Sequence, residues 1–240
     1  MKVLIFGTCY VATPERQKLT SQWAALHRRL NPECDLLLVD SASPIDPLEN
    51  MRATGGVYTG CGYLMKFYDA DGIRVQSFTD NIGHLSHDGR DGWGRAFCHG
   101  LKYAIEAGYD VVAHVEGDSL FRLPVMSIGE QMERDGIRVA SVPIGYGEAQ
   151  RSTWVETGLM FFEVDYLRKS NFIAGYDWPN RTAKPQPEIV IRRMLGEDLV
   201  MLPLKAERSD KGEITVDNVT EFDWITHCAP EVYERFESVL

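Results

Sequence analysis

The feature that most constrains the fold is a strand–helix–strand pattern at the start of the chain. Residues 2–8 form a short apolar run closed by Gly7, which is typical of a buried parallel strand. Apolar residues then recur at helical spacing over residues 14–30, after Thr13 as the expected N-cap. A second buried strand is predicted at residues 35–40. This order implies a right-handed crossover between parallel strands, with ligands expected outside their carboxyl ends.

The same pattern recurs in the middle of the chain. Residues 73–80 are predicted to form a strand, and residues 81–94 a loop rich in Gly, His and Asp. An amphipathic helix is expected at residues 95–109 and another buried strand at residues 110–116. Residues 41–72 carry turn signals that do not place an element.

The second half of the chain gives more mixed signals. The predicted elements are strands at 137–145, 154–164, 198–202 and 222–226, a helix at 186–195 and a proline-bearing loop at 176–187. The expected fold class is therefore α/β, with a mixed, mostly parallel, Rossmann-like sheet flanked by helices. A chain of 240 residues can bury a substantial core, so we expect a single domain over residues 1–240.

Composition excludes several classes of protein. The formal net charge is −10 and no basic cluster is present, so no nucleic-acid partner is expected. The longest apolar runs are far shorter than the roughly 20 residues of a transmembrane helix. The N-terminus lacks the features of a secretory signal, which makes a cytoplasmic location the expectation. The five cysteines are spread widely and predicted to be reduced packing residues, with Cys9 placed to line a pocket.

The strongest local signal for chemistry is the run Glu116-Gly117-Asp118. It follows an apolar strand where the chain must turn out of the sheet, at the same edge as Thr8 and Asp40. Hard cations such as Mg²⁺ and Mn²⁺ take oxygen ligands, often from only one or two protein carboxylates. A turn with two solvated acids is the alternative. We predict Asp118 as a metal ligand, and Glu116 as a contact to sugar or ribose hydroxyls or to a metal-bound water.

With these features the sequence resembles the GT-A-fold nucleotide-sugar glycosyltransferases. The segments that carry the resemblance, which spans most of the chain, are 6-FGTCY-10, Asp40, 89-GRDGWGRA-96, 116-EGD-118, Pro187-Glu188 and His227. In that family the acid motif binds a metal and the diphosphate of a nucleotide sugar. This chain differs in having Glu as the first acid of the motif and Pro187-Glu188 in place of a common Glu-Asp pair. The resemblance implies a nucleotide-binding half at 1–120 and an acceptor-side half at 121–240.

The resemblance also implies roles for individual residues. The residues expected to bind the nucleotide are Gly7, Thr8, Tyr10, Asp40, Arg95 and Glu116, and the expected metal ligands are Asp118 and His227. Arg90 and Arg95 would lie near the diphosphate, because a guanidinium binds phosphate oxygens in a bidentate way. For Arg90, a solvent-exposed turn is an equal alternative. Three further histidines lack ligand spacing and are predicted to be structural, namely His84, His87 and His99.

Glu188 is the candidate catalytic base. A carboxylate there could remove the proton from an acceptor hydroxyl as the sugar is transferred. An acid that stabilises the helix dipole is the alternative, and the resemblance favours catalysis. On the acceptor side, Trp154 is predicted to stack on a sugar, and Glu156 and Thr157 to contact its hydroxyls, although Trp154 also fits a core position. Similar candidates in the proline-bearing loop are Tyr176, Trp178 and Arg181.

These assignments predict a metal-dependent glycosyltransferase that acts in glycan or polysaccharide synthesis. It would use Mn²⁺ or Mg²⁺ and move a sugar from a nucleotide-diphosphate sugar to an acceptor hydroxyl, with inversion as the simpler outcome if Glu188 is the base. One alternative is a sugar-1-phosphate nucleotidyltransferase, which should carry a glycine-rich basic loop after the first strand, whereas residues 7–18 contain one glycine. Another is a binding or scaffold domain of the same fold, in which the two acids only form a turn.

Overall fold

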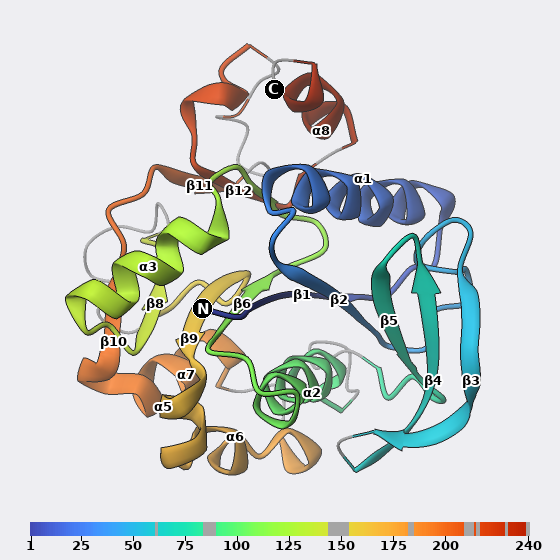
Figure 1. The fold of residues 1–240 in the computed structure, drawn as a ribbon, viewed down its shortest axis with the longest axis horizontal. Helices are drawn as coiled ribbons and strands as arrows, with labels where there is room; N and C mark the ends of the chain where they lie inside the picture. Colours follow the sequence, from blue (N-terminus) through green and yellow to red (C-terminus); the bar gives the residue numbers. More distant parts are fainter. Residues whose placement is uncertain are drawn as a thin grey trace.

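The computed structural model describes residues 1–60, 62–83, 90–143, 154–181, 185–208, 214, 217–228 and 230–238. These residues form a nine-stranded sheet with helices on both faces and a separate three-stranded sheet (Figure 1). The large sheet has the spatial order β10 (Leu199–Met201), β8 (Val139–Ser141), β9 (Leu159–Glu163), β6 (Val111–Val115), β1 (Val3–Cys9), β2 (Asp35–Asp40), β5 (Ile73–Phe78), β4 (Tyr63–Ala70) and β3 (Arg52–Gly60). The small sheet has the order β11 (Ala206–Arg208), β12 (Trp224–Thr226) and β7 (Leu120–Phe121).

The helices form two layers around the large sheet, except for α8 (Pro230–Glu237), which packs on the outer side of α1 (Pro14–Leu30) (Figure 1). The other helices are α2 (Gly92–Glu106), α3 (Val125–Asp135), α5 (Val164–Lys169), α6 (Phe172–Gly175) and α7 (Pro187–Leu195). Short 3-10 turns lie at η2 (Trp178–Asn180), η3 (Gly196–Asp198) and η5 (Val219–Glu221). Figure 1 shows α1 and α3 on one face and α2, α5, α6 and α7 on the other.

The central strands confirm the predicted α/β class. Strands β5, β2, β1 and β6 are neighbours and all run parallel, whereas β9 is antiparallel to both β6 and β8. Side chains of β1 alternate between the two faces, because successive residues of a strand point to opposite sides. Val3 and Ile5 join the core cluster that contains residues of α1 and α3, and Leu4 and Phe6 join the cluster that contains residues of α2.

The start of α1 confirms the sequence prediction, whereas the start of α2 corrects it. Thr13 caps α1, and its side chain accepts a hydrogen bond from the amide of Arg16 at 3.4 Å. Helix α2 begins at Gly92, inside the predicted loop 81–94, because the buried carboxylate of Asp91 accepts a hydrogen bond from the Gly94 amide at 2.7 Å. Such a cap satisfies a free amide of the first turn.

Two other stretches differ from the prediction. Residues 41–72, which gave no clear element, contain the β3–β4 hairpin that extends the sheet at one edge. The predicted strand 154–164 is shorter, since β9 covers only Leu159–Glu163 and α5 begins at Val164. The carboxylate of Glu156 instead accepts a hydrogen bond from the Gly158 amide at 3.0 Å, and this local bond competes with strand pairing.

The C-terminal segment packs on α1 and encloses a third core cluster. Leu26 of α1 and Tyr233 of α8 are buried there, together with Ile225 of β12. Antiparallel pairing of β12 with β7 places the C-terminal segment next to the turn that follows β6 (Figure 1). Residues 225–228 and 118–121, far apart in the sequence, therefore become neighbours.

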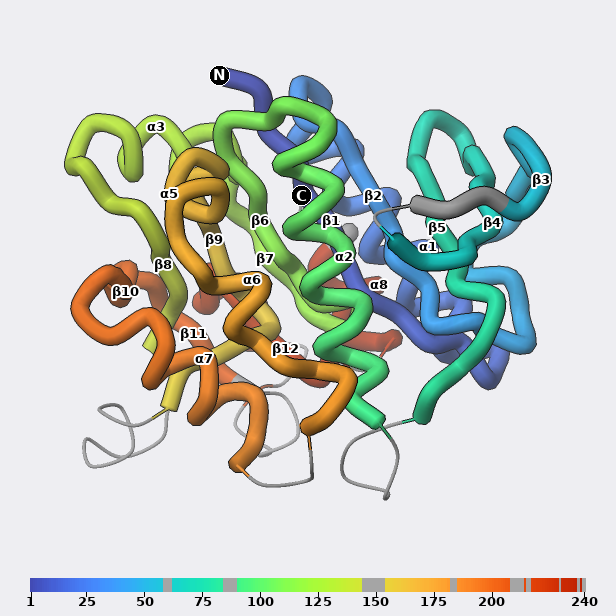
Figure 2. Tube along the Cα trace, turned by 90° about the horizontal axis from the view of Figure 1, so that it is seen from below, coloured from blue at the N-terminus to red at the C-terminus, as the bar shows by residue number. Residues whose placement is uncertain are grey.

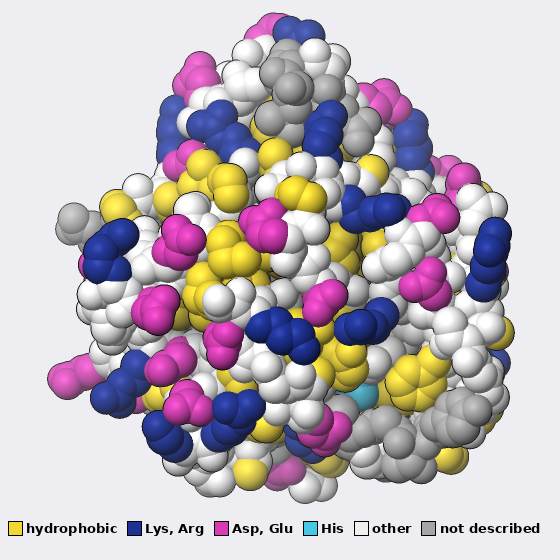
Figure 3. All heavy atoms as spheres, in the orientation of Figure 1, with side chains coloured by type: hydrophobic (Ala, Val, Ile, Leu, Met, Phe, Trp, Pro, Cys, Tyr) yellow, Lys and Arg dark blue, Asp and Glu magenta, His cyan; other side chains and the backbone are white. Residues whose placement is uncertain are grey.

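The described residues also bear on the surface charge and on the cysteines. No helix within the described residues is long and apolar enough to span a membrane. On the face shown in Figure 3, Lys and Arg side chains are interspersed with Asp and Glu side chains. Four cysteines in the described residues are free, namely Cys9, Cys34, Cys98 and Cys228, and Cys61 lies outside the described residues.

Three buried histidines predict that acid destabilises the fold. Burial lowers the pKa of His27 to about 3 and those of His99 and His114 to about 4, from an ordinary value of 6.5. Below pH 6.5 these histidines therefore bind protons in the unfolded chain but not in the folded chain. The free energy of unfolding falls as the pH decreases towards the pKa values of the folded state. Each histidine contributes up to about 1.4 kcal/mol per pH unit in this window.

A His27→Gln variant isolates one of these contributions. Its free energy of unfolding, relative to that of the wild type, should rise by about 2 kcal/mol between pH 7.5 and pH 5. Urea unfolding at both pH values measures this difference, and the value at pH 7.5 serves as the internal reference. A difference that stays constant with pH would show that His27 does not carry the effect.

Candidate functional site

The carboxyl ends of the parallel strands bring the predicted site residues to one edge of the sheet. Cys9 of β1 pairs with Asp40 of β2, which pairs with Ser77 of β5. The turn after β6 emerges beside them, and a Cβ atom on Gly117 would lie 3.2 Å from the backbone oxygen of Thr8. In Figure 2 the N-terminus lies at the top, and the first turns of α2 and α7 lie at the opposite, lower edge.

The acid motif forms a tight turn that is anchored on both sides. The amide of Glu116 donates to the carbonyl of Gly158 at 2.9 Å, and the amide of Ser119 donates to the carbonyl of Glu116 at 2.9 Å. Asp118 is largely buried, and its Oδ2 lies 3.3 Å from Nη1 of Arg16. Within the described part of the chain, Oδ1 of Asp118 is buried without a hydrogen-bond partner. One oxygen of Asp118 is thus left for a further ligand.

His227 lies beside Asp118, as the sequence-based assignment requires. Its Nδ1 is 3.7 Å from Oδ2 of Asp118, and its side chain is 41% exposed. The amide of Cys228 donates to the backbone oxygen of Asp118 at 2.9 Å, and Ser119 Oγ lies 3.2 Å from Thr226 Oγ1. His227 has φ of 55°, a left-handed conformation that is uncommon outside glycine. Strained residues of this kind often cluster at functional sites.

The segment before β9 contributes two of the predicted acceptor-side residues. Because β9 runs antiparallel to β6, its first residue Leu159 pairs with Val115 at the end of β6. Glu156 and Thr157 are buried here, and Trp154 is half-buried. A Cβ atom on Gly158 would lie 3.1 Å from a carboxylate oxygen of Glu116 and 3.1 Å from one of Glu156. Because glycine has no side chain, position 158 leaves room for the carboxylates of Glu116 and Glu156.

Three neighbouring carboxylates act on Glu116 at this edge. Burial is the leading cause that raises the pKa of Glu116 well above its ordinary value, followed by the negative charges of Asp118, Glu156 and Glu188. Glu188 lies in the first turn of α7, as predicted, and is half-buried. Because like charges in a low-dielectric site disfavour ionisation, such a cluster favours a bound cation or a proton.

A Glu116→Gln variant should be more stable than the wild type at pH 8. The folded pKa of Glu116 is raised, so this residue costs stability as the pH rises above the unfolded value of 4.5. Glutamine keeps the shape without the charge, and we expect a melting temperature about 2–4 °C higher at pH 8, with a smaller gain at pH 5. Differential scanning calorimetry measures both. The control is Glu163→Gln, which changes an exposed acid elsewhere, and an equal gain in both variants would contradict the prediction.

The residues assigned to the nucleotide lie around the end of β1. Gly7 is buried, and an added Cβ atom would lie 3.0 Å from the ring of Trp23 and 3.1 Å from the carbonyl of Val115, which accounts for glycine there. Thr8 is buried, with its Oγ1 3.4 Å from Nε2 of His114. Tyr10 is 48% exposed at the same edge. Among these residues, Tyr10 offers the largest free surface to a ligand.

Asp40 is buried, and its oxygens are already used by the protein. Ser77 donates to Oδ2 at 2.7 Å, and the amide of Ser43 lies 3.2 Å from the same atom. Burial is the leading cause that raises the pKa of Asp40, and the hydrogen bonds from Ser43 and Ser77 oppose it. The Ser43 hydroxyl in turn accepts from the Val11 amide at 2.6 Å, so Asp40 holds together the loops that follow β1 and β2.

Arg95 is buried and bound to the protein. Its Nη1 lies 3.2 Å from Oδ1 of Asp80, and its guanidinium lies 3.8 Å from the centre of the Phe78 ring. Arg90 is exposed, whereas His84 and His87 lie outside the described residues. His99 is buried, and its Nε2 lies 2.6 Å from Oε1 of Gln76, in agreement with its predicted structural role.

Two candidates in the proline-bearing loop are used for packing. Tyr176 is buried, and its hydroxyl donates to Asp91 at 2.7 Å. The guanidinium of Arg181 forms an ion pair with Asp91 at 2.9 Å, and its side chain is mostly buried. Both side chains thus secure the first turn of α2. Trp178 is half-buried, and its indole donates to the Tyr63 hydroxyl at 3.2 Å.

Sequence reasoning missed two side chains at this edge. Arg16 reaches Asp118 from α1, although 102 residues separate them. His114 is buried in β6 and contacts the Thr157 carbonyl through Nδ1 at 2.7 Å, while its Nε2 faces Thr8. The only sequence signal for His114 was its place in the run 114-HVEGD-118, which ends in the acid motif. No local signal pointed to Arg16.

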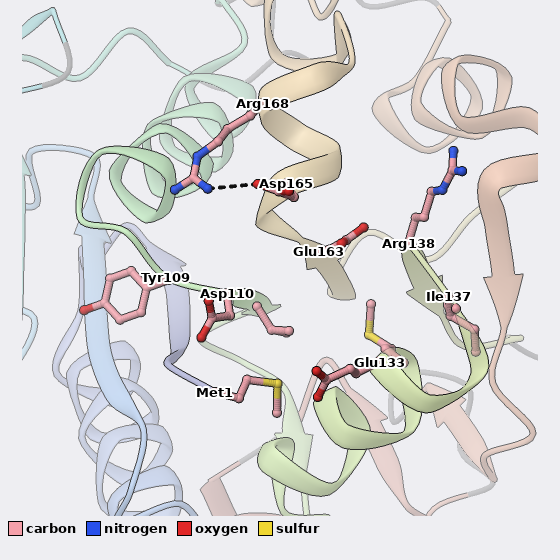
Figure 4. A pocket seen from close by; sticks show the side chains of 12 residues that line it. Met1, Tyr109, Asp110, Glu133, Ile137, Arg138, Glu163, Asp165 and Arg168 are labelled. Atoms are coloured by element: carbon pink, nitrogen blue, oxygen red, sulfur yellow. Dashed lines mark hydrogen bonds and ion pairs between the residues drawn. The ribbon is translucent and has the colours of Figure 1, made fainter.

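A separate pocket of about 620 Å³ lies at the amino end of the strands. Figure 4 shows Met1, Asp110 and Glu133 around it, with Arg168 paired to Asp165 at 3.0 Å. None of its lining residues belongs to the acid motif or to the other predicted site residues. The pocket and the acid motif are therefore on opposite edges of the sheet.

The residues present fit a hard divalent cation. The buried, unpartnered Oδ1 of Asp118 and the adjacent imidazole of His227 offer one oxygen and one nitrogen ligand. In the described ranges, no group of three or more His, Cys, Asp or Glu side chains is already arranged as a metal site. Such a sparse protein shell is typical of a cation that completes its coordination with phosphate oxygens and water.

Comparisons with known proteins identify the fold. No protein-family profile matches the chain, and no curated protein matches it in sequence. One similar solved structure is an active-site mutant of LgtC, with a TM-score of 0.58 and 12% sequence identity; the match covers 100% of this chain and 96% of that one. Another is galactosyltransferase LgtC in complex with donor and acceptor sugar analogues, with a TM-score of 0.55 and 11% identity over 96% of this chain and 88% of that one. A glycosyltransferase involved in glycosylation of the major capsid of PBCV-1 is also similar, with a TM-score of 0.54 and 9% identity over 99% of this chain and 98% of that one. The predicted GT-A-like fold is thereby confirmed.

Proposed function

We propose that this protein is a glycosyltransferase that moves a sugar from a nucleotide-diphosphate sugar to an acceptor hydroxyl. The observation that carries the proposal is the turn after β6, which presents Asp118 with a free buried oxygen next to His227. That turn lies at the ligand-binding edge of a parallel sheet. The fold shared with LgtC and the capsid glycosyltransferase supports the same reaction class. The solved LgtC complex with donor and acceptor analogues makes a sugar acceptor the first candidate.

In the proposed site, the two sides of the acid turn have different tasks. Tyr10 and Thr8 would contact the nucleotide, whereas Glu116 and Glu156 lie closer to β9 and would accept hydrogen bonds from sugar hydroxyls. Trp154, half-buried before β9, would stack on the acceptor, with Thr157 beside it. Asp40 and Gly7 would act through packing, because both are enclosed by protein contacts.

Asp118 and His227 would hold Mn²⁺ or Mg²⁺ in the proposed site. When bound, such a cation supplies positive charge that stabilises the leaving diphosphate. Asp118 contributes a carboxylate oxygen, and His227 a nitrogen that is held near it by the Cys228 amide. Such a cation would offset the repulsion between an acidic protein and a phosphorylated substrate.

Glu188 is the proposed base. During transfer, the bond between the anomeric carbon and the diphosphate oxygen breaks, and a bond to the acceptor oxygen forms. The acceptor proton must leave, and a half-buried carboxylate close enough to raise the pKa of Glu116 can take it. Direct displacement with inversion follows most simply if Glu188 has this role.

Calorimetric titration with UDP and GDP, each with and without Mn²⁺, tests the proposal. We expect one nucleotide to bind only when the metal is present, which also identifies the donor base. Release of that nucleotide from its sugar conjugates would then establish the reaction class. If neither nucleotide binds under any condition, a scaffold domain is the better description. Pyrophosphate release from a nucleoside triphosphate and a sugar 1-phosphate would instead identify a nucleotidyltransferase.

A further inference from the structure

Arg16 is an exposed arginine whose side chain contacts the acid motif. It lies in the first turn of α1, directly after the loop that leaves β1, and its side chain is 56% exposed. Its backbone is fixed, because its amide donates to Thr13 Oγ1 and its carbonyl accepts from Thr20 Oγ1 at 2.9 Å. Within the described residues, its guanidinium hydrogen-bonds to Oδ2 of Asp118, with Nη1 at 3.3 Å. An ion pair with so exposed a partner is weak and easily exchanged.

Arg16 is also the local counter-charge of the acid cluster. Of the Lys and Arg side chains that the structure describes, only that of Arg16 forms an ion pair with Asp118 or Glu116. Arg95, which the sequence suggested as a phosphate ligand, is instead buried with Asp80. In the described part of the chain, Arg16 is therefore the exposed arginine that already contacts the acid motif.

We propose that Arg16 is a donor-binding residue that pairs with Asp118 in the free protein and binds the diphosphate of the nucleotide sugar in the complex. This inference rests on the proposed function. A cation bound to Asp118 would neutralise the carboxylate and release the guanidinium. The diphosphate then presents paired oxygens that match the two parallel N–H groups of arginine. The amino end of the 17-residue helix α1 adds a favourable partial positive charge for an anion.

The proposal predicts two changes of opposite sign in an Arg16→Gln variant. Mn²⁺ alone should bind more tightly, by about 2–5-fold, because an exposed competing cation has been removed from Asp118. UDP or GDP, whichever the wild type binds, should bind at least about 10-fold more weakly in saturating Mn²⁺, because a charged hydrogen bond is lost. Arg16→Lys keeps the charge without the paired N–H groups and should give an intermediate nucleotide affinity.

Calorimetric titration of Mn²⁺ alone and of nucleotide with Mn²⁺ measures both changes. The matched control is Arg28→Gln, an exposed arginine at the far end of the same helix, which should change neither affinity. If Arg16→Gln weakens both ligands or changes neither while the wild type binds normally, the Arg16 inference alone is overturned. If the wild type binds no nucleotide, the proposed function fails together with it.

Discussion

Replacing Asp118 with asparagine is expected to abolish metal-dependent nucleotide binding and to slow sugar transfer by at least about 10²–10³-fold. The substitution keeps the size of the side chain but removes the charge from the buried, unpartnered oxygen and from the contact with His227. Because the diphosphate and the acid cluster are both negative, donor binding depends on the cation that Asp118 would hold. Titration of nucleotide with Mn²⁺ and a steady-state transfer assay measure the two effects.

Stability distinguishes a functional role of Asp118 from a structural one. The negative charge of Asp118 is one cause of the raised pKa of Glu116, so its removal relieves repulsion between the two acids. The melting temperature of the variant should therefore equal or exceed that of the wild type, as is common when a strained active site is neutralised. Asp135→Asn, at the exposed end of α3, is the control and should leave binding, rate and stability unchanged. Normal metal-dependent binding by Asp118→Asn would exclude Asp118 as a metal ligand.

Replacing Trp23 with alanine is expected to destabilise the fold by about 3–5 kcal/mol. Trp23 is fully buried between α1 and the sheet, and its ring fills the space above Gly7. Its indole N–H donates to the carbonyl of Val115 at 3.1 Å, one residue before the acid turn. The loss of this side chain leaves a cavity and an unpaired buried carbonyl, and each lowers the free energy of unfolding. Urea unfolding monitored by circular dichroism measures the change.

Trp23→Phe separates the two causes. Phenylalanine keeps much of the apolar volume but cannot donate the hydrogen bond, so its cost should be about 1–3 kcal/mol. The control is Val200→Ala, because Val200 is 38% exposed, and this change should stay within about 0.5 kcal/mol of the wild type. If Trp23→Ala cost no more than Val200→Ala, the packing of α1 on the sheet would not depend on Trp23.

Local sequence patterns were sufficient for the elements that are buried and regular. Helix α1 has a capping threonine and apolar residues at helical spacing, and the apolar runs of β1, β2 and β6 stand out from their surroundings. The β3–β4 hairpin gave no such signal, since β3 is largely exposed, glycine-bearing and irregular in its pairing. Helix α3 begins without a side-chain cap, which removes the usual signal of a helix start.

The sequence by itself determined the parallel core and the place of Glu116 and Asp118, because a buried strand must deliver the residues that follow it to the sheet edge. Only the tertiary structure decided which side chains meet them. Arg16 and His227 contact Asp118 from the two ends of the chain, whereas Arg95 forms its ion pair with Asp80. Such partners are chosen by packing over long sequence separations, and local periodicity carries no information about those contacts.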